Sequence, residues 1–393
     1  MQLSFNERQQ DLYGQFSELG RPVALSAPEN DKVCRLDTEN WQKISHAGIW
    51  RLPVPTRLGG AGGSWLDCVA AIEGVASTAE DLGFMITMLG HVGALRILLY
   101  EGTPEQQQRW LDRLMSGEIG ITAMTEDTGG SDLARMRVAA REDEAGWRLS
   151  GRKSHITNAP VAAFGMIAGR IPSLGDKRDI ALFFVDLDTP GVSLGRSEDN
   201  LGIRTSPTAD LILDGVPLRL NNIIGTPGDG LRILCDIISF ERALYGVIAS
   251  GLIEGMIKKA MARVESRWAF NRPLADYQYV QGRITDMKIA ATVCRFATYA
   301  AFGKIESKTE DASIACSIAK FLAGEHLLAS AEHLVQLHGH LGFMNNDLSR
   351  QLRDAVGMRI AGGTSDIQRI NIFNQLRRLN KKPVASPLAV AAE

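Results

Sequence analysis

The sequence predicts an α+β protein in which a β domain lies between two helical regions. Apolar residues follow a helical spacing from residue 6 to residue 117, and they return to that spacing after Gly230. Between residues 119 and 218 the period falls toward two, which is typical of strands. We therefore expect an N-terminal helical domain, a middle β-barrel or sandwich domain and a C-terminal helical domain.

These changes of period also predict where the domains begin and end. The expected parts are an N-terminal helical domain at 1–117, a middle β domain at 118–227, a C-terminal helical bundle at 228–380 and a flexible tail at 381–393.

Local patterns justify the elements within each part. In the first helical region Trp110, Leu111 and Leu114 fall on one side of a helix. In the β region the turn at 143–146 predicts a hairpin, and the apolar run 180–185 predicts a buried strand.

The second helical region carries an apolar stripe on its first helix. The stripe consists of Leu244, Ile248, Leu252 and Met256. Glu254 and Lys258 lie four residues apart on another face, so we expect them to form an ion pair.

Composition excludes several classes of protein. The 393 residues carry 43 Lys and Arg against 45 Asp and Glu, so a net charge of -2 gives no case for nucleic acid as a partner. No secretory signal is visible at the start, and no uncharged apolar run approaches the roughly 20 residues that cross a bilayer. We expect a cytoplasmic protein that does not bind membranes. Its five scattered cysteines, without a C-x-x-C pair, are expected to be buried free thiols.

Several common catalytic motifs are missing from the sequence. It contains no G-x-G-x-x-G after a strand, no G-x-x-x-x-G-K-[ST] and no G-x-S-x-G. A Rossmann enzyme, a P-loop NTPase and an α/β-hydrolase therefore lose support. His333, His338 and His340 lie close together, but they lack further ligands at suitable spacing, so no metal site is expected.

Four segments combine small, hydroxyl-bearing and charged residues of the kind that bind a phosphorylated heterocycle. They are TEDTGGSD at 125–132, GRKSHITNAP at 151–160, RWAFNRPL at 267–274 and AGGTSDIQR at 361–369. In the last of them Thr364 can cap a helix whose first turn carries Asp366, and the free amides there suit an anion. Each segment taken alone is also compatible with an ordinary turn.

Together these segments resemble the acyl-CoA dehydrogenase superfamily, over about residues 5–380. Further matches are LGIRTSPT at 201–208, DGVP at 214–217, QLHGHLGF at 336–343 and RDA at 353–355. The resemblance implies the three-domain fold named above, with a four-helix bundle as its third part. It also implies FAD between the β domain and the bundle, within a homotetramer or homodimer.

The resemblance also assigns residues to the cofactor. Thr125 and Ser131 resemble flavin and pyrophosphate contacts, Thr157 a hydroxyl near the reactive edge of the ring, and His155 a neighbour of the flavin. The residues that would contact the distal half of FAD or complete its site are Arg267, Phe270, Gln278, Gln336, Gly339, Thr364 and Asp366. Arg267, Phe270 and Gln278 would reach the FAD of a neighbouring subunit.

The reaction that the resemblance implies needs a base for a thioester α-proton and hydrogen bonds to the carbonyl oxygen. Many members carry a glutamate directly before the Gly-Thr of the fourth segment, but here that position is Gly362. A second arrangement in the superfamily places the base on the first helix of the bundle, where this sequence has Glu241. We expect Glu241 to be the base, the amide of Gly362 to bind the carbonyl and Arg242 to position the substrate. The alternatives are a helix-start carboxylate for Glu241 and a helix–helix ion pair for Arg242.

Three residues depart from the superfamily's pattern. His155 stands where most relatives carry Trp or Phe, and it either tunes the flavin, contacts a polar substrate or packs as a hydrogen-bonded histidine. Asp127 replaces a usual proline and Asn271 a usual glycine, which changes the stiffness of two loops.

The predicted activity is α,β-dehydrogenation of an acyl thioester, with flavin N5 as hydride acceptor and an electron-transfer flavoprotein or oxygen as the final acceptor. Segments 156–162 and 363–368 also look similar to relatives that oxidise acyl or aminoacyl groups on carrier proteins in natural-product pathways. The thioester is therefore a CoA or a carrier-protein thioester. A flavin monooxygenase on the same fold and a non-catalytic FAD-binding protein are the remaining alternatives.

Overall fold

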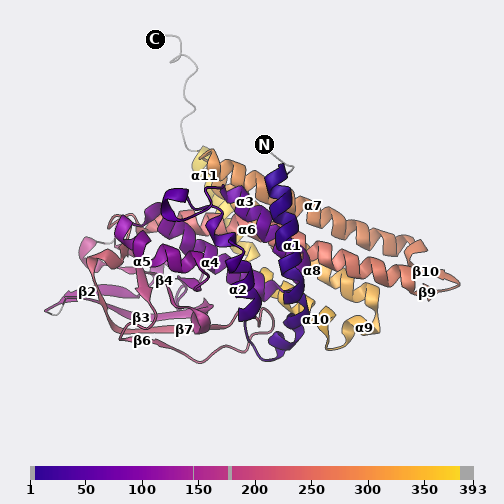
Figure 1. The fold of residues 1–393 in the computed structure, drawn as a ribbon, viewed down its shortest axis with the longest axis horizontal. Helices are drawn as coiled ribbons and strands as arrows, with labels where there is room; N and C mark the ends of the chain where they lie inside the picture. The colour runs from indigo at the N-terminus through magenta and orange to yellow at the C-terminus, as the bar shows by residue number, and fades with distance from the viewer. Residues whose placement is uncertain (1–4, 145, 176–178, 381–393) are drawn as a thin grey trace, which may run out of the picture.

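The computed structural model describes residues 5–144, 146–175 and 179–380. The sheet lies at one end of the molecule, and the longest helices extend to the other end (Figure 1). The tail expected at 381–393 and Ala145 of the expected hairpin turn lie outside the described residues.

The N-terminal part is helical, as the spacing predicts. Its elements are α1 (Glu7–Lys32), α2 (Thr38–His46), η1 (Ile49–Arg51), η2 (Thr56–Leu58), α3 (Trp65–Ala79), α4 (Leu82–Glu101) and α5 (Pro104–Met115). Asn6 begins α1 with a capping box that includes Gln9. The stripe of α5 is confirmed, because Trp110, Leu111 and Leu114 are all buried.

The middle part forms a sheet, which in the described residues contains eight strands in the order β6-β7-β3-β2-β4-β5-β8, with β1 beside β4. Its elements are β1 (Gly120–Ala123), η3 (Leu133–Arg135), β2 (Ala139–Asp143), β3 (Gly146–Thr157), η4 (Ala159–Val161), β4 (Phe164–Arg170), η5 (Pro172–Leu174), β5 (Ile180–Asp186), β6 (Val192–Leu194), β7 (Thr208–Leu218), η6 (Leu220–Asn222) and β8 (Ile223–Ile224). The predicted hairpin is confirmed, since β2 and β3 pair antiparallel with Ala140 opposite Leu149. The predicted buried strand is β5.

The C-terminal part is a bundle in which α6, α7, α8 and α11 pack together. Its elements are α6 (Gly230–Ser266), β9 (Trp268–Ala269), β10 (Arg272–Pro273), η7 (Leu274–Asp276), α7 (Gln278–Glu306), α8 (Ala312–His338), α9 (His340–Phe343), α10 (Asp347–Met358) and α11 (Ser365–Asn380). The predicted apolar stripe of α6 is buried throughout. The expected ion pair within α6 is wrong: Glu254 Oε1 instead lies 2.5 Å from Nζ of Lys288 on α7. A tertiary partner competes with the local one here.

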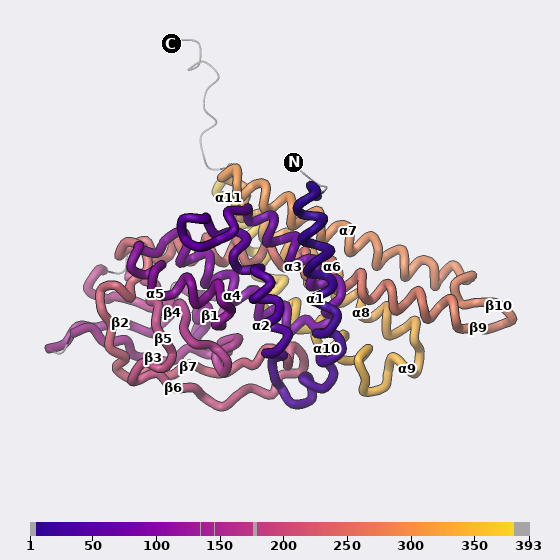
Figure 2. Tube along the Cα trace, viewed as in Figure 1, coloured from indigo at the N-terminus to yellow at the C-terminus, as the bar shows by residue number. Residues whose placement is uncertain are grey.

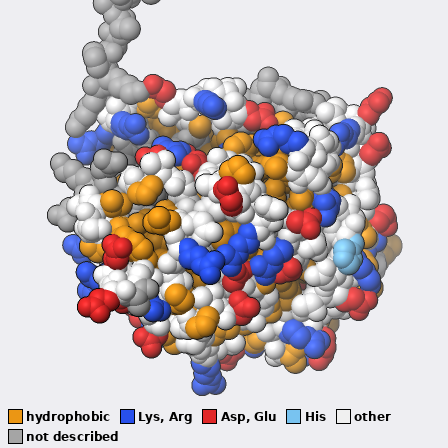
Figure 3. Space-filling view, turned by 60° about the vertical axis from the view of Figure 1, so that its left-hand side comes forward, with side chains coloured by type: hydrophobic (Ala, Val, Ile, Leu, Met, Phe, Trp, Pro, Cys, Tyr) orange, Lys and Arg blue, Asp and Glu red, His pale blue; other side chains and the backbone are white. Residues whose placement is uncertain are grey.

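The tube in Figure 2 shows the β9–β10 hairpin at the end of the molecule farthest from the sheet. The hairpin turn consists of Phe270 and Asn271, both with positive φ, and the Phe270 ring is 92% exposed. The first helices, the bundle and one face of the sheet share one apolar core, while a second core lies within the β domain. Figure 3 shows a face on which basic and acidic side chains are interspersed, as the near-zero net charge predicts.

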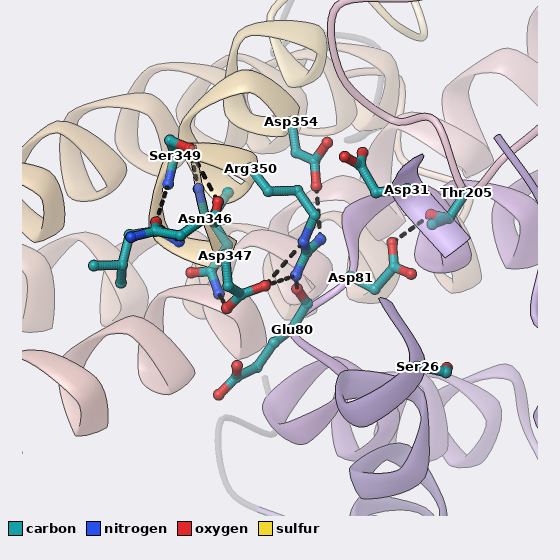
Figure 4. Close-up of polar contacts among 12 residues, drawn as sticks. Ser26, Asp31, Glu80, Asp81, Thr205, Asn346, Asp347, Ser349, Arg350 and Asp354 are labelled. Atoms are coloured by element: carbon teal, nitrogen blue, oxygen red, sulfur yellow. Dashed lines mark hydrogen bonds and ion pairs between the residues drawn. The ribbon is translucent and has the colours of Figure 1, made fainter. Parts of the chain in front are cut away.

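A buried polar network joins the three parts of the fold (Figure 4). Arg350 of α10 donates from Nη1 to Oδ2 of Asp354 at 3.0 Å and from Nη2 to the carbonyl of Glu80 at 2.7 Å. Asp354 also accepts the N–H of Ile203 at 2.7 Å, in the loop between β6 and β7. The RDA motif at 353–355 therefore ties the bundle to the other two parts.

Two helices are long and apolar enough to cross a membrane by length and composition alone. The apolar window of α4 is 83% buried within the fold, so α4 is a core helix, and that of α8 is 39% buried. All five cysteines are free, as expected. The expectation that they are buried is confirmed for three and wrong for two. Cys68, Cys294 and Cys316 are buried, Cys34 is half-buried and Cys235 is exposed.

Candidate active site

The carboxylate of Glu241 lies where the three parts of the fold meet. Glu241 is on α6, and its Oε1 accepts a hydrogen bond from Oγ1 of Thr122 on β1 at 3.4 Å. On the α4 side it faces Gly93, where a Cβ atom would lie 2.1 Å from Oε1. Glycine at position 93 is therefore required for the carboxylate to occupy this place.

The surroundings of Glu241 change its acidity. Burial raises the pKa of its carboxyl group from 4.5 to about 8, although the Thr122 hydrogen bond and the charge of Arg242 act in the opposite direction. The conjugate base is therefore stronger than that of an exposed glutamate. A raised pKa on a half-buried carboxyl group is a common property of catalytic bases.

The loop before α11 lies beside the next residues of α6. Arg242 donates from Nε to the carbonyl of Gly362 at 3.3 Å, so the alternative of a helix–helix ion pair for Arg242 is not what the structure has. Gln368 Nε2 also donates to the carbonyls of Gly362 and Gly363, at 3.3 and 2.9 Å. These bonds hold the loop by its carbonyl groups. Among the described residues no backbone acceptor is found for the N–H of Gly362, so it is free to bind a carbonyl oxygen.

Position 362 cannot hold a larger residue without rearrangement. Gly362 has a φ of +70°, and a Cβ atom there would lie 2.7 Å from the hydroxyl oxygen of Tyr245. The ring of Tyr245 thus fills the space into which a side chain at position 362 would extend. Gly93 and Gly362 thus leave room for two side chains of α6. Glu241 occupies the space beside Gly93, and Tyr245 occupies the space beside Gly362.

Two cations near α6, the half-buried Arg96 and the buried Lys320, escaped the sequence analysis. The guanidinium carbon of Arg96 lies 4.2 Å from the ring centre of Phe240 and 4.7 Å from that of Tyr100. Lys320 donates to the carbonyl of Met358 at 3.1 Å, and burial lowers its pKa to about 8. A charged residue inside an otherwise apolar helical stretch was the available signal for both.

The loop that carries Thr125 and Ser131 is fixed to strand β3. Ser154 N–H donates to the Thr125 carbonyl at 2.9 Å, and Ser154 Oγ donates to Oδ1 of Asp127 at 2.6 Å. Lys153 is fully buried, and its Nζ lies 2.7 Å from Oε1 of Glu126, the residue that follows Thr125. Asp127 therefore restrains the loop through its side chain.

The end of β3 presents the other two residues expected beside the flavin. His155 has a φ of +57°, and its Nδ1 lies 2.7 Å from Oε1 of Glu198. Its ring is hydrogen-bonded but exposed, which argues against the alternative of a packed histidine. Thr157 ends the strand.

The residues expected at the distal half of FAD lie elsewhere. Arg267, Phe270 and Gln278 surround the β9–β10 hairpin, which Figures 1 and 2 show far from the sheet. Gln336 and Gly339 lie at the end of α8. A single chain does not bring the hairpin residues to the Thr125 loop. That they reach the FAD of another subunit stays a prediction.

The last two expected residues begin α11. Thr364 Oγ1 accepts the N–H of Ile367 at 3.3 Å, so the predicted cap is confirmed. Asp366 lies in the first turn of the helix, as expected.

Comparisons with known proteins agree with this architecture. Three family models match in order: the acyl-CoA dehydrogenase N-terminal domain at 8–118, the middle domain at 122–216 and the C-terminal domain at 228–376. The mitochondrial short-chain specific acyl-CoA dehydrogenase of Rattus norvegicus is 30% identical over 354 residues, which cover 90% of this chain and 85% of that protein.

Solved structures show the same fold. Butyryl-CoA dehydrogenase from Megasphaera elsdenii has a TM-score of 0.91 at 26% identity, covering 96% of this chain and 100% of its own. The prolyl acyl carrier protein oxidase AnaB has a TM-score of 0.89 at 28% identity, covering 95% and 100%. The FAD complex of PigA has a TM-score of 0.89 at 26% identity, covering 96% and 99%. The chain therefore belongs to the acyl-CoA dehydrogenase family, with that family's three-domain fold and its cofactor, FAD.

Proposed function

We propose that this protein catalyses FAD-dependent α,β-dehydrogenation of an acyl thioester, with Glu241 as the base that removes the α-proton. The observation that carries the proposal is the half-buried carboxylate of Glu241, facing Gly93 and Thr122, with a pKa raised to about 8. The alternative of a helix-start carboxylate is wrong, because α6 begins at Gly230 and Glu241 lies three turns farther along the helix.

The residues of this chain account for the proton transfer. The α-proton of a thioester is weakly acidic, so it needs a base whose conjugate acid is not too strong, and burial gives Glu241 that property. The N–H of Gly362 donates to the thioester carbonyl oxygen, where negative charge develops as the proton leaves. Thr122 holds one carboxylate oxygen, and the proton ends on Glu241. FAD supplies the acceptor for the β-hydrogen when it is bound.

The residues that would hold FAD fall into two groups. The group beside the sheet consists of Thr125, Ser131, His155 and Thr157. The loop that carries Thr125 is held by Ser154, and it offers hydroxyl and amide groups. The fully exposed aromatic ring at the hairpin tip, Phe270, belongs to the second group and suits a nucleotide bound by another copy. We therefore propose that the enzyme is a homotetramer or homodimer in which subunits share FAD sites.

The carrier of the acyl group has two candidates, CoA and a carrier protein. The rat relative and the Megasphaera structure are named for acyl-CoA substrates, whereas AnaB is named as a prolyl acyl carrier protein oxidase. Similarity at this level supports both, and the pantetheine arm is common to the two carriers. An electron-transfer flavoprotein or oxygen would reoxidise the flavin, and a cytoplasmic location remains a prediction from the sequence.

Two other functions keep the same fold. A flavin monooxygenase needs no carboxylate base at position 241, and the matched pair Glu241 and Gly93 argues against it. A non-catalytic FAD-binding protein would contain flavin that no thioester reduces.

An anaerobic titration of the FAD-loaded protein tests the proposal. Purified enzyme is mixed with a panel of acyl-CoA and acyl-carrier-protein thioesters, prolyl among them, and the flavin absorbance is followed. We expect one class of thioester to bleach the flavin band and Glu241→Gln to abolish the bleaching.

Glu254→Gln is the matched control, because Glu254 lies on the same helix but pairs with Lys288. It should bleach like wild type. Bleaching retained by Glu241→Gln would contradict the assignment of the base. Flavin that no thioester bleaches would favour the two other functions.

A further inference from the structure

The hydroxyl group of Tyr245 lies in the proposed site without a hydrogen-bond partner among the described residues, and its oxygen is not sealed from solvent. Tyr245 is 5% exposed, and its hydroxyl makes no hydrogen bond to any residue that the structure describes. A ligand that displaces solvent from this hydroxyl group must offer it a hydrogen-bond partner, because an unpaired hydroxyl group in a desolvated site is costly. A bound ligand is one way to supply that partner.

The hydroxyl points to the place where the reaction is proposed to occur. Tyr245 follows Glu241 by four residues on α6, so the two side chains lie on the same face of the helix. Its hydroxyl oxygen lies 2.7 Å from the position of a Cβ atom at Gly362. A side chain at position 362 would therefore extend into the space that the hydroxyl occupies. The hydroxyl thus lies on the Cβ side of Gly362 and on the α6 face that carries the proposed base.

Nearby polar groups do not satisfy the hydroxyl. The carbonyl of Gly362 already accepts from Arg242 and Gln368. Lys320 Nζ lies 5.8 Å from the Tyr245 ring centre, and it donates to Met358 instead.

We propose that Tyr245 determines substrate specificity by donating a hydrogen bond to an oxygen or nitrogen atom in the acyl group, close to the carbons that react. The preferred substrate class is then a thioester of a short polar acyl group rather than of a plain hydrocarbon chain. This inference rests on the proposed thioester dehydrogenation.

A pair of isosteric probes isolates the hydrogen bond. The pantetheine thioesters of 3-methoxypropionate and pentanoate differ by one ether oxygen in place of a methylene group, and pantetheine is common to CoA and carrier proteins. The FAD-loaded Glu241→Gln protein, which should not turn over, is titrated with each probe, and Kd is read from the flavin absorbance shift.

We expect the ether probe to bind about five- to tenfold more tightly, as one net hydrogen bond predicts. Adding Tyr245→Phe should remove this preference. Adding Tyr13→Phe on α1, a tyrosine outside the site, should leave it intact. Melting temperatures of all variants show whether the fold persists.

Three results overturn the inference. They are a preference that survives Tyr245→Phe, an equal loss of affinity for both probes, and no binding of either probe to Glu241→Gln although other thioesters bleach the wild-type flavin. Failure of the proposed function is separate, because it shows as wild-type flavin that no thioester bleaches, whatever the two probes do in binding.

Discussion

The carboxylate of Glu241 occupies the space directly in front of Gly93. A Cβ atom on Gly93 would lie 2.1 Å from Oε1 and 3.1 Å from the carboxyl carbon, while the methyl group of Thr122 would be at 3.3 Å. The atoms that would have to move belong to the end of a flexible side chain, not to the backbone. The position of the proposed base therefore depends on a residue that takes no part in the reaction.

Gly93→Ala should slow thioester oxidation at least tenfold, because the added methyl group pushes the carboxylate away from its site. The fold should tolerate the change, since alanine is better than glycine inside a helix by about 0.5–1 kcal/mol. The rate of anaerobic flavin bleaching and the melting temperature together check this expectation.

Gly90→Ala is the matched control for that variant. It lies one turn earlier on α4, and its Cβ atom would meet Nδ2 of Asn158 at 3.4 Å, an ordinary contact. Equal rates for Gly93→Ala and Gly90→Ala would show that the carboxylate does not need the space before Gly93.

The rate of flavin reduction should rise with pH and level off above about pH 8. Glu241 must be ionised to accept a proton, and burial raises its pKa to about 8. Below that value the rate should fall about tenfold per pH unit. Stopped-flow reduction between pH 6 and 9.5 measures the profile, and a rate that stays constant through this range would exclude Glu241 as the titrating base.

Glu241→Gln should also change how stability depends on pH. The folded-state pKa is raised from 4.5 to about 8, so the folded protein holds a proton that the unfolded chain has released in this window. The contribution of Glu241 to the free energy of unfolding therefore falls as pH rises from about 4.5 to 8. The melting temperature of Glu241→Gln relative to wild type should increase between pH 5 and pH 8. A difference that does not vary with pH would contradict the raised pKa.

The order of the three parts was predictable because the apolar period is helical in the first and third parts and close to two in the middle part. The hairpin at 143–146 and the Thr364 cap were predictable too, since both depend on neighbouring residues. The partner of Glu254 was not, because a lysine on another helix replaced the local one.

The convergence at the site was harder to predict. Thr122 and Glu241 are separated by 119 residues, and one sequence contains no record of such a distant contact. The resemblance supplied Glu241 and Gly362, but the facing residues Gly93 and Tyr245 follow only from the packing of α4 and the α11 loop against α6.

Lys153→Met should weaken FAD binding and destabilise the protein. Lys153 and Glu126 form a buried pair, and Glu126 also accepts the N–H groups of Arg137 and Val138 at 2.6 and 3.0 Å. Removing the cation leaves a buried carboxylate unpaired, which costs about 3–5 kcal/mol. The loop that carries Thr125 then loses one of its anchors to β3, while those of Ser154 remain. Equilibrium dialysis of FAD and chemical unfolding measure the two effects.

The double variant Lys153→Met with Glu126→Gln serves as the control for charge. It removes both members of the pair, so it should be more stable than Lys153→Met alone. Wild-type FAD affinity in Lys153→Met would show that the Lys153–Glu126 pair does not support the loop that carries Thr125.

Moving the base to position 362 should fail while Tyr245 is present. The double variant Glu241→Gly with Gly362→Glu moves the carboxylate to the loop before α11, but its new Cβ would lie 2.7 Å from the Tyr245 hydroxyl, at a backbone φ of +70°. We expect no bleaching of the flavin by any thioester that wild type oxidises. Adding Tyr245→Ala frees the space and should recover part of the rate, although the backbone strain remains. Activity in the double variant without the third change would mean that Tyr245 does not close this position, and that the choice of base on α6 has another cause.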